Sequence, residues 1–346
     1  MEIMILLSLL FIILLANIEI EKRGGYRDDY LSLNTSSAWK GIAACFILIH
    51  HISKEVVTGG IFQILNYIAF PMVAIFLFYS GYGMVNGIAK KTGYLDCFLK
   101  VRFKKVMSPY YIVAIIATIV ETVILHKELY FDDILTLIIG GKYWFVFCIM
   151  IVYLIFYITQ KIGMKYALSD NIRILMFTSG ILLYCVVCFL LSLSSQYTAS
   201  MSAAVLGVLL GYKESCIIQF IRRKYVLNTV LLIIAFVLVF IGRLGLAYVG
   251  VQNEIIHTAL RNIISATFIF CLIAISQKVG ICMKRIMCFL CDLSYEMYLC
   301  SVPLIDNTCD KFAHYAGYSI VICVTTIFIA YILHRIAKGK RVLSKA

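Results

Sequence analysis

Residues 36–54 read SSAWKGIAACFILIHHISK, an apolar stretch with one lysine near its start and two adjacent histidines near its end. On a helix, with about 100° per residue, Lys40 and His51 fall within about 20° of each other, and His50 lies about 80° from this line. The axial distance from Lys40 to His51 is about 16 Å, about half the hydrocarbon thickness of a bilayer. Imidazole titrates near neutral pH and can accept and return a proton. The stretch therefore predicts a membrane helix with a cation near one surface and a proton-transfer group within the membrane.

The composition of the chain excludes a water-soluble protein. Of its 346 residues, 62% are hydrophobic and 14% are charged, and the mean hydropathy is +0.96. This balance is typical of proteins that cross a membrane several times. No segment between the apolar runs is long enough to build a soluble domain. We therefore expect a transmembrane anchor with a basic linker over residues 1–30, and one membrane domain over residues 31–346.

Eleven apolar runs predict an all-α, polytopic membrane protein with about eleven transmembrane helices: an N-terminal anchor and a core of ten. The runs are 3–18, 41–58, 61–88, 109–125, 143–159, 173–193, 199–212, 226–246, 256–276, 286–303 and 316–335. The first run lacks the positively charged start and the small-residue cleavage site of a secretory signal peptide. We therefore expect it to remain as an uncleaved anchor.

Lys and Arg are distributed unevenly between the two sides of this topology. Of the 31 basic residues, 25 fall in connections on one side and six on the other. The six are Lys54, Lys127, Lys142, Arg243, Arg261 and Lys311. Because connections rich in Lys and Arg stay in the cytoplasm, the split predicts an outside N-terminus and a cytoplasmic C-terminus. It also accounts for the net charge of +13 without a nucleic-acid partner.

Most of the 13 cysteines lie inside apolar runs. Two pairs, Cys185 with Cys188 and Cys288 with Cys291, have a C-x-x-C spacing, but neither has a suitably placed histidine or second pair. We interpret the cysteines as small apolar core residues, and we expect neither a metal site nor disulfides.

The outer half of the run 41–58 contains four ionisable residues: His50, His51, Lys54 and Glu55. A charged group near the centre of a bilayer costs about 2.5 kcal/mol or more, so this accumulation requires an explanation. One interpretation is a short helix whose end already lies at the interface. The other is a water-accessible cavity lined by His51, with Glu55 one turn further on to orient the ring or stabilise its charge.

Two further motifs follow in the next runs. The segment Phe76–Tyr82 reads FLFYSGY, in which Ser80 offers a hydroxyl and Gly81 allows close helix packing. The segment Lys100–Lys105 reads KVRFKK and precedes a proline that opens the next span. Such a basic, amphipathic segment binds either lipid headgroups or the phosphates of a nucleotide-bearing donor.

Two aromatic motifs occur later in the chain. The segment Gly140–Phe145 reads GGKYWF, and its Trp144 has the pattern of an interfacial anchor. The segment Leu293–Leu299 reads LSYEMYL and opens a late span. Asp292 and Glu296, one helical turn apart, are candidates for pairing with cationic loop residues.

In this order and spacing, the motifs resemble acyltransferase family 3, a family of integral-membrane acyltransferases, many of which O-acetylate cell-surface polysaccharide or peptidoglycan. The resemblance runs from about residue 36 to residue 333. The family's opening motif, an arginine and then, after ten residues, a histidine, corresponds to Lys40 and His51, with lysine in place of arginine. The other matching segments are Phe76–Gly81 for FF-x-x-SG, Arg102–Lys105 for R-x-x-R with lysine in the second place, Trp144–Phe145 for WF, and Ser294–Leu299 for SY-x-x-YL. Family members often carry a histidine two residues after the last segment, where this chain has Ser301.

The resemblance implies acyl transfer from cytoplasmic acyl-CoA, either acetyl-CoA or another acyl-CoA, to a hydroxyl of an extracytoplasmic polysaccharide or glycolipid, without a metal. The donor phosphates would be bound by Lys40, Arg102 and Lys105. His51 would act as the general base on the acceptor hydroxyl or would itself carry the acyl group, and simple base catalysis is the favoured route. The setting it implies is the bacterial cytoplasmic membrane, with lipids around the protein.

The remaining candidate residues have supporting roles in this scheme. Glu55 is expected to assist His51, and Ser80, Gly81 and Trp144 are expected to contact substrate. Two alternatives stay open. One is a transporter or flippase for a lipid-linked glycan, which would not require an aligned lysine and histidine. The other is an inactive relative that acts as a sensor, suggested by the lysine substitutions and Ser301.

Overall fold

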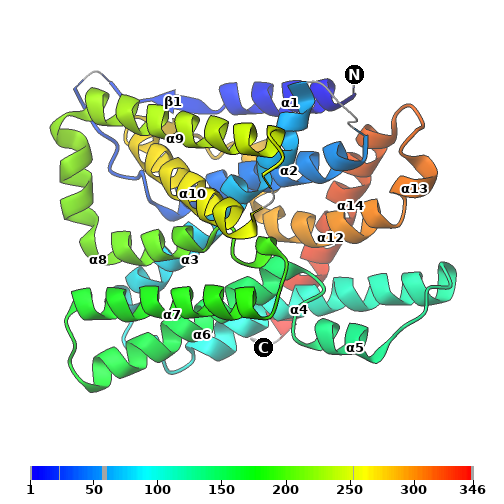
Figure 1. Cartoon of the computed structure of the whole chain (residues 1–346), viewed down its shortest axis with the longest axis horizontal. Coiled ribbons are helices and arrows are strands. Elements are labelled where there is room, and N and C mark those ends of the chain that lie inside the picture. The colour runs from blue at the N-terminus through cyan, green and yellow to red at the C-terminus, as the bar shows by residue number, and fades with distance from the viewer. Residues whose placement is uncertain (1, 23, 57–60, 252, 344–346) are drawn as a thin grey trace.

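The computed structural model describes residues 2–22, 24–56, 61–251 and 253–343, which form a bundle of helices (Figure 1). The helices are α1 (Glu2–Leu15), α2 (Leu33–Val56), α3 (Ala69–Lys90), α4 (Phe98–Ile119), α5 (Phe131–Ile138), α6 (Trp144–Lys165), α7 (Asp170–Leu190), α8 (Met201–Arg223), α9 (Tyr225–Tyr248), α10 (Glu254–Ser276), α11 (Arg285–Asp292), α12 (Ser294–Asp306), α13 (Cys309–Phe312) and α14 (Tyr318–Leu343). Three short helical segments are η1 (Ile61–Tyr67), η2 (Val120–Ile124, a π-helix) and η3 (Ser195–Tyr197).

The prediction of an all-α, polytopic membrane protein is confirmed. Within the described ranges, eight helices are long and apolar enough to cross a membrane, or nine if α11 and α12, which meet at 60°, form one broken span. The two remaining predicted runs fall on α1 and α2. Because α1 has only 14 residues, it is about 21 Å long, less than the hydrocarbon thickness of about 30 Å. The number of eleven crossings therefore remains a prediction.

The first helix ends earlier than its apolar run, and a small sheet follows it. The side-chain amide of Asn17 donates to the carbonyl of Ile13 at 2.7 Å, and the carbonyl of Asn17 accepts from the backbone of Cys282 at 2.7 Å. Strand β1 (Ile18–Ile20) then pairs antiparallel with β2 (Val279–Ile281). An asparagine that satisfies a carbonyl of the last turn ends the helix here, although the hydropathy continues.

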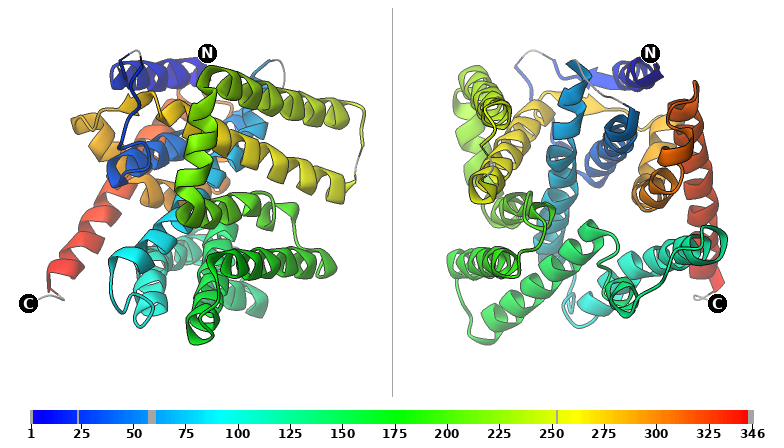
Figure 2. Two further views of the ribbon diagram at one scale, coloured as in Figure 1. Left: turned by 90° about the vertical axis from the view of Figure 1, so that its left-hand side faces the viewer. Right: turned by 45° about the vertical axis from the view of Figure 1, so that its right-hand side comes forward.

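Helices α2 and α3 occupy the middle of the bundle. In the right-hand view of Figure 2, α8, α9 and α10 lie on one side of them, α12 and α14 lie on the other, and α4, α6 and α7 lie below. Three connections lie at one end of the bundle, on the left in Figure 1: residues 91–97, 166–169 and 224. Many of the basic residues lie in these connections or next to them. We call this the basic end. The start of α2 is also there, since Tyr30 donates to the Glu214 carboxylate of α8 at 2.6 Å.

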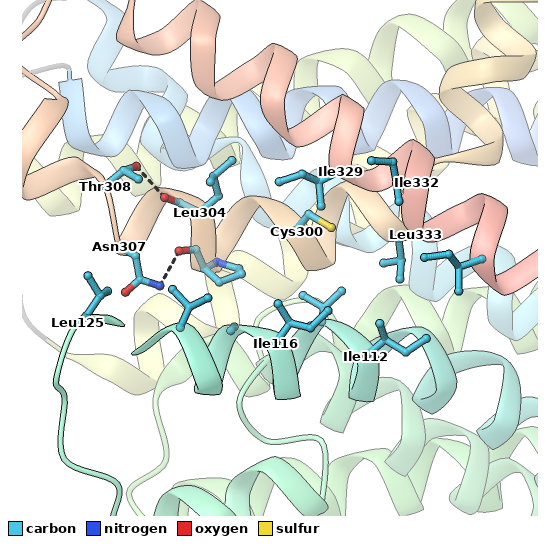
Figure 3. Close-up of a pocket in the computed structure, with 15 residues that line it drawn as sticks. Ile112, Ile116, Leu125, Cys300, Leu304, Asn307, Thr308, Ile329, Ile332 and Leu333 are labelled. Carbon is cyan, nitrogen blue, oxygen red and sulfur yellow. Dashed lines mark hydrogen bonds between the residues drawn. The ribbon is translucent and has the colours of Figure 1, made fainter. Parts of the chain in front are cut away.

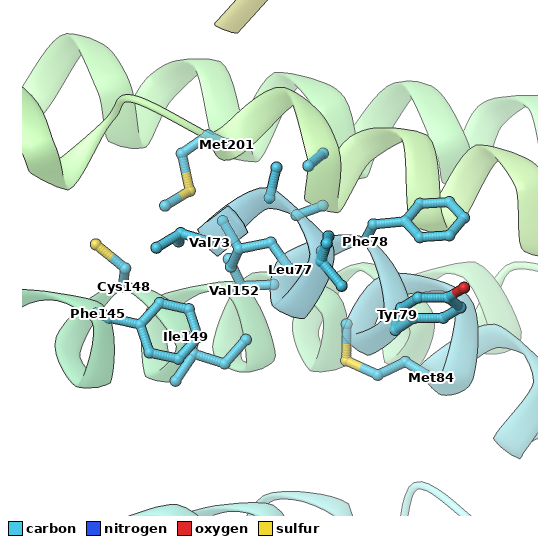
Figure 4. Close-up of a cluster of buried hydrophobic side chains, with 14 of the residues drawn as sticks. Val73, Leu77, Phe78, Tyr79, Met84, Phe145, Cys148, Ile149, Val152 and Met201 are labelled. Carbon is cyan, nitrogen blue, oxygen red and sulfur yellow. The ribbon is translucent and has the colours of Figure 1, made fainter. Parts of the chain in front are cut away.

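The closest helix contact in the core is made by two glycines. A Cβ atom at Gly81 would lie 2.6 Å from the carbonyl oxygen of Ala204, and one at Gly207 would lie 2.2 Å from that of Phe78. The backbones of α3 and α8 therefore touch, as small residues at membrane-helix interfaces permit. Around this contact, apolar side chains of α3, α6 and α8 interlock (Figure 4).

Candidate active site

Lys40 and His51 lie on one stripe of the continuous helix α2, with Ile47 between them. Lys40 lies nearer the basic end, and its ammonium nitrogen is 5.7 Å from the centre of the Tyr79 ring. The stripe predicted from the spacing of these residues is therefore present in the structure.

Three cations that the sequence assigned to donor binding are brought together. The ammonium of Lys40 lies within electrostatic range of both Arg102 and Lys105 of α4. Since the first two are partly buried and Lys105 is exposed, the group has an open side toward solvent. Such a cluster suits a ligand with several phosphates, because each phosphate offers charge-assisted hydrogen-bond acceptors.

Aromatic side chains hold the guanidinium of Arg102. Its Nη2 donates to the Tyr94 hydroxyl at 2.8 Å, and its central carbon lies 5.7 Å from the Phe98 ring centre and 5.6 Å from that of Tyr153. Tyr153 also interacts with the hydroxyl of Ser80. Ser80 thus belongs to the surroundings of Arg102, whereas its neighbour Gly81 serves the contact between α3 and α8.

The two adjacent histidines have different surroundings. The Nδ1 atom of His50 lies 2.8 Å from the carbonyl oxygen of Leu65, so this nitrogen carries the proton and the buried ring is fixed. The ring of His51 makes no hydrogen bond to another residue in the part of the chain that the structure describes. Its partly buried ring packs edge to face on that of His50, with 5.2 Å between centres. Unlike His50, His51 therefore has a ring that no described residue holds by a hydrogen bond.

Glu55 and the His51 ring show no interaction within the described residues. His51 interacts electrostatically with His50 and Lys54. Glu55 instead interacts electrostatically with Asp306, the last residue of α12, and with Cys309, the first residue of α13. The one-turn spacing of Glu55 and His51 thus does not produce a hydrogen bond between them within the described residues.

A layer of rings separates the cation cluster from His51. Phe76, Phe145 and Tyr298 pack edge to face, with 5.9 Å between the first two ring centres and 5.6 Å between the last two. Together with Ile47, Val73 and Tyr295 they surround a cavity of about 10 Å³, which is at the lower limit for one water molecule. These rings lie beside Ile47, at the level of α2 between Lys40 and His51.

Trp144 lies in the first turn of α6, at the end of this helix that points away from the basic end. Its ring packs edge to face on that of Phe145, with 6.1 Å between centres. The structure thus connects Trp144 to the ring layer, but it does not bring Trp144 to the Ser80 and Arg102 surroundings.

One ionisable pair was missed by the sequence reasoning. The Glu296 carboxylate lies 3.1 Å from Nδ1 of His334, and both side chains are largely buried between α12 and α14. Glu296 was expected to meet loop cations, and its partner instead comes from a helix 38 positions later. In the sequence, His334 stands out as an ionisable residue inside the last apolar run, 316–335. Ser301 is fully buried, and its hydroxyl donates to the Tyr298 carbonyl at 3.0 Å.

A larger apolar groove of about 440 Å³ lies on the other face of α12, between α4 and α14 (Figure 3). Its lining is apolar apart from Asn307 and Thr308 at one end. Cys300 and Leu304 line this groove, whereas Tyr295 and Tyr298 face the ring layer, as helical periodicity requires. The groove contains none of the predicted site residues and suits a hydrocarbon chain.

Across the described ranges, no group of three or more His, Cys, Asp or Glu side chains is arranged to hold a metal ion.

Comparison with known proteins gives one match. The model of acyltransferase family 3, described as an acyltransferase domain, matches residues 35–335. This range contains Lys40, His51, Arg102, Lys105 and Trp144. No curated protein and no solved structure matches the chain.

Proposed function

The chain belongs to acyltransferase family 3 and is a multi-pass membrane acyltransferase; on this premise, we propose that it transfers an acetyl or similar short acyl group from cytoplasmic acyl-CoA to a hydroxyl of an extracytoplasmic, cell-surface glycan. The observation that carries the proposal is the arrangement along α2. A three-cation cluster lies toward the basic end, and an imidazole whose ring has no hydrogen-bond partner among the described residues lies further along the same stripe.

The cation cluster supports an acyl-CoA donor. Lys40, Arg102 and Lys105 would bind its phosphates at the cytoplasmic side, where the distribution of basic residues predicts the basic end to lie. The fixed guanidinium of Arg102 would provide planar, two-donor recognition, and Lys40 would provide a point charge. The acyl-bearing arm would then pass through the layer of Phe76, Phe145 and Tyr298.

His51 would act as the general base. Its ring would accept the proton of the acceptor hydroxyl while the hydroxyl oxygen attacks the thioester carbonyl carbon. The carbon–sulfur bond then breaks, the ester forms, and the coenzyme A thiolate leaves and takes up a proton. A second route has the same balance in two steps: the acyl group first passes to a ring nitrogen of His51 and then to the hydroxyl oxygen. In both routes, His50 fixes the position of α2 through Leu65.

The first test compares the two histidines in purified protein supplied with radiolabelled acetyl-CoA and a crude envelope extract as acceptor. We expect His51→Asn to lower the rate of acyl transfer by about 10²- to 10⁴-fold, the usual contribution of a general base. His50→Asn is the matched control, because the asparagine amide can still donate to Leu65, and it should retain most of the activity. Label bound to the wild-type protein would favour the acyl-histidine route.

Two results would contradict the proposal. One is an active His51→Asn variant. The other is a wild-type protein that neither binds nor consumes acyl-CoA, which would favour a transporter of lipid-linked glycans, since a transporter would not hydrolyse the donor.

A further inference from the structure

Arg243 has an unusual position for a charged residue. It is the one buried residue of α9 in the described chain, and only 6% of its surface is exposed, whereas the rest of this apolar helix faces outward. It lies in the last third of α9, toward the end opposite the basic end, where α9 and α10 run side by side (Figure 1). Buried charges in proteins are normally paired with an opposite charge.

No such pairing exists for two of the three guanidinium nitrogens. Nε and Nη1 of Arg243 are buried and have no hydrogen-bond partner among the described residues. The guanidinium carbon lies 4.8 Å from the Tyr67 ring centre and 5.1 Å from that of Phe70. The two rings stabilise the cation through their faces, but they satisfy none of its donors.

A second guanidinium adds positive charge beside the first. Arg261 of α10 acts electrostatically on Arg243, and it donates to the hydroxyl of Ser195 in η3. The carboxylate of Glu254, which is exposed in the first turn of α10, interacts electrostatically with both arginines. The cluster therefore keeps an excess of positive charge. Arg261 is less buried than Arg243.

The arginine cluster is connected to the histidines by a few residues of chain. Leu65 accepts from His50, Tyr67 and Phe70 flank Arg243, and all three belong to the segment that runs from η1 into α3. A ligand held at Arg243 would thus lie on the same segment that fixes His50, the neighbour of His51.

We infer that Arg243 and Arg261 form an anion site for the acceptor, which binds a carboxylate or phosphate group of the glycan and places its hydroxyl near His51. Guanidinium groups with free donors match the oxygens of both anions. This inference rests on the proposed function, because it assigns the acceptor to the extracytoplasmic end. It predicts that the natural acceptor is acidic.

Binding can be tested without any acyl transfer. A ligand that binds only the folded state raises Tm, and the rise grows with ligand concentration. We expect glucuronate or inorganic phosphate to raise the Tm of the full-length, detergent-solubilised protein, relative to chloride at equal ionic strength. Arg243→Gln should abolish the rise, and Arg261→Gln should reduce it. Lys311→Gln, which removes an exposed cation of α13, should behave like the wild type.

Three outcomes are decisive. Equal ligand-dependent rises in wild type and Arg243→Gln, or no rise in either, would overturn the anion site. A rise caused by phosphatidylglycerol but by neither soluble anion would assign the site to a lipid headgroup and overturn the acceptor assignment. The expected rise in a protein that does not turn over acyl-CoA would leave the anion site standing while the proposed function failed.

In a preparation that transfers acyl groups, the assignment of Arg243 to the acceptor site can be tested separately by enzyme kinetics. We expect the KM for a glucuronate oligosaccharide to increase at least tenfold in Arg243→Gln, while the KM for its neutral methyl ester increases much less. An equal increase for both acceptors would show that Arg243 has a structural role only, and would contradict the assignment.

Discussion

At the scale of single residues, two residues that are adjacent in the sequence have different surroundings and different expected roles. His50 and His51 are adjacent, yet one is fixed by Leu65 and the ring of the other has no hydrogen-bond partner among the described residues. A helix turns by about 100° per residue, so adjacent side chains face different surroundings. The sequence predicts His51 as the site histidine through its alignment with Lys40. It did not indicate that Glu55 turns toward Asp306, because an i, i+4 spacing permits a contact without requiring one.

Lys40 provides a prediction at this scale. We expect Lys40→Ala to raise the KM for acetyl-CoA about tenfold, because a charge-assisted contact worth about 1.5–3 kcal/mol is lost. Lys40→Arg should keep or lower the KM, since a guanidinium can stack on the Tyr79 ring and bind a phosphate with two donors. Lys104→Ala, an exposed neighbour in α4, is the control. An unchanged KM in Lys40→Ala would remove Lys40 from the donor site.

At the scale of helices, the apolar runs identified the elements, because a bilayer requires a long, uninterrupted run to be helical. Their ends and contacts depended on interactions that hydropathy does not contain. Asn17 ended α1 early, and residues 18–20 paired with a strand more than 250 positions later. The pair of Glu296 and His334, and the rings around Arg243, likewise join segments whose proximity only the fold determines.

The contact of α3 with α8 gives a prediction at the helix scale. We expect Gly81→Ala to destabilise the protein by about 1–3 kcal/mol, because the new methyl group would overlap the Ala204 carbonyl. Gly83→Ala on the same helix should be neutral or slightly stabilising, since nothing lies within 4 Å of its added carbon. Thermal unfolding in detergent measures both. A Gly81→Ala protein of normal Tm but raised acceptor or donor KM would instead support the substrate contact suggested by the family motif.

At the scale of the whole molecule, the distribution of charge predicts the orientation. The basic end carries the Lys- and Arg-rich connections, so we place it in the cytoplasm, with the N-terminus, His51 and Arg243 toward the outside. The proposed reaction requires this orientation, because the donor cations must face cytoplasmic acyl-CoA and the imidazole must face the glycan.

Native cysteines at the two ends of the bundle can test the orientation. Cys97 is exposed at the basic end, and Cys309 opens α13 at the opposite end. Burial, with a smaller effect of the Glu55 and Asp310 carboxylates, raises the pKa of the Cys309 thiol. Because the thiolate is the reactive form, a raised pKa means slower labelling near pH 7 and a stronger gain as the pH rises.

We therefore expect a membrane-impermeant maleimide to label intact cells at Cys309, faster at pH 8.5 than at pH 7. Cys309→Ser should abolish this signal. Labelling at Cys97, identified by its loss in Cys97→Ser, should require permeabilised cells. The reverse pattern would place the basic end outside. The cluster of Lys40, Arg102 and Lys105 would then have no access to cytoplasmic acyl-CoA, and the proposed direction of acyl transfer would fail even if His51 proved essential.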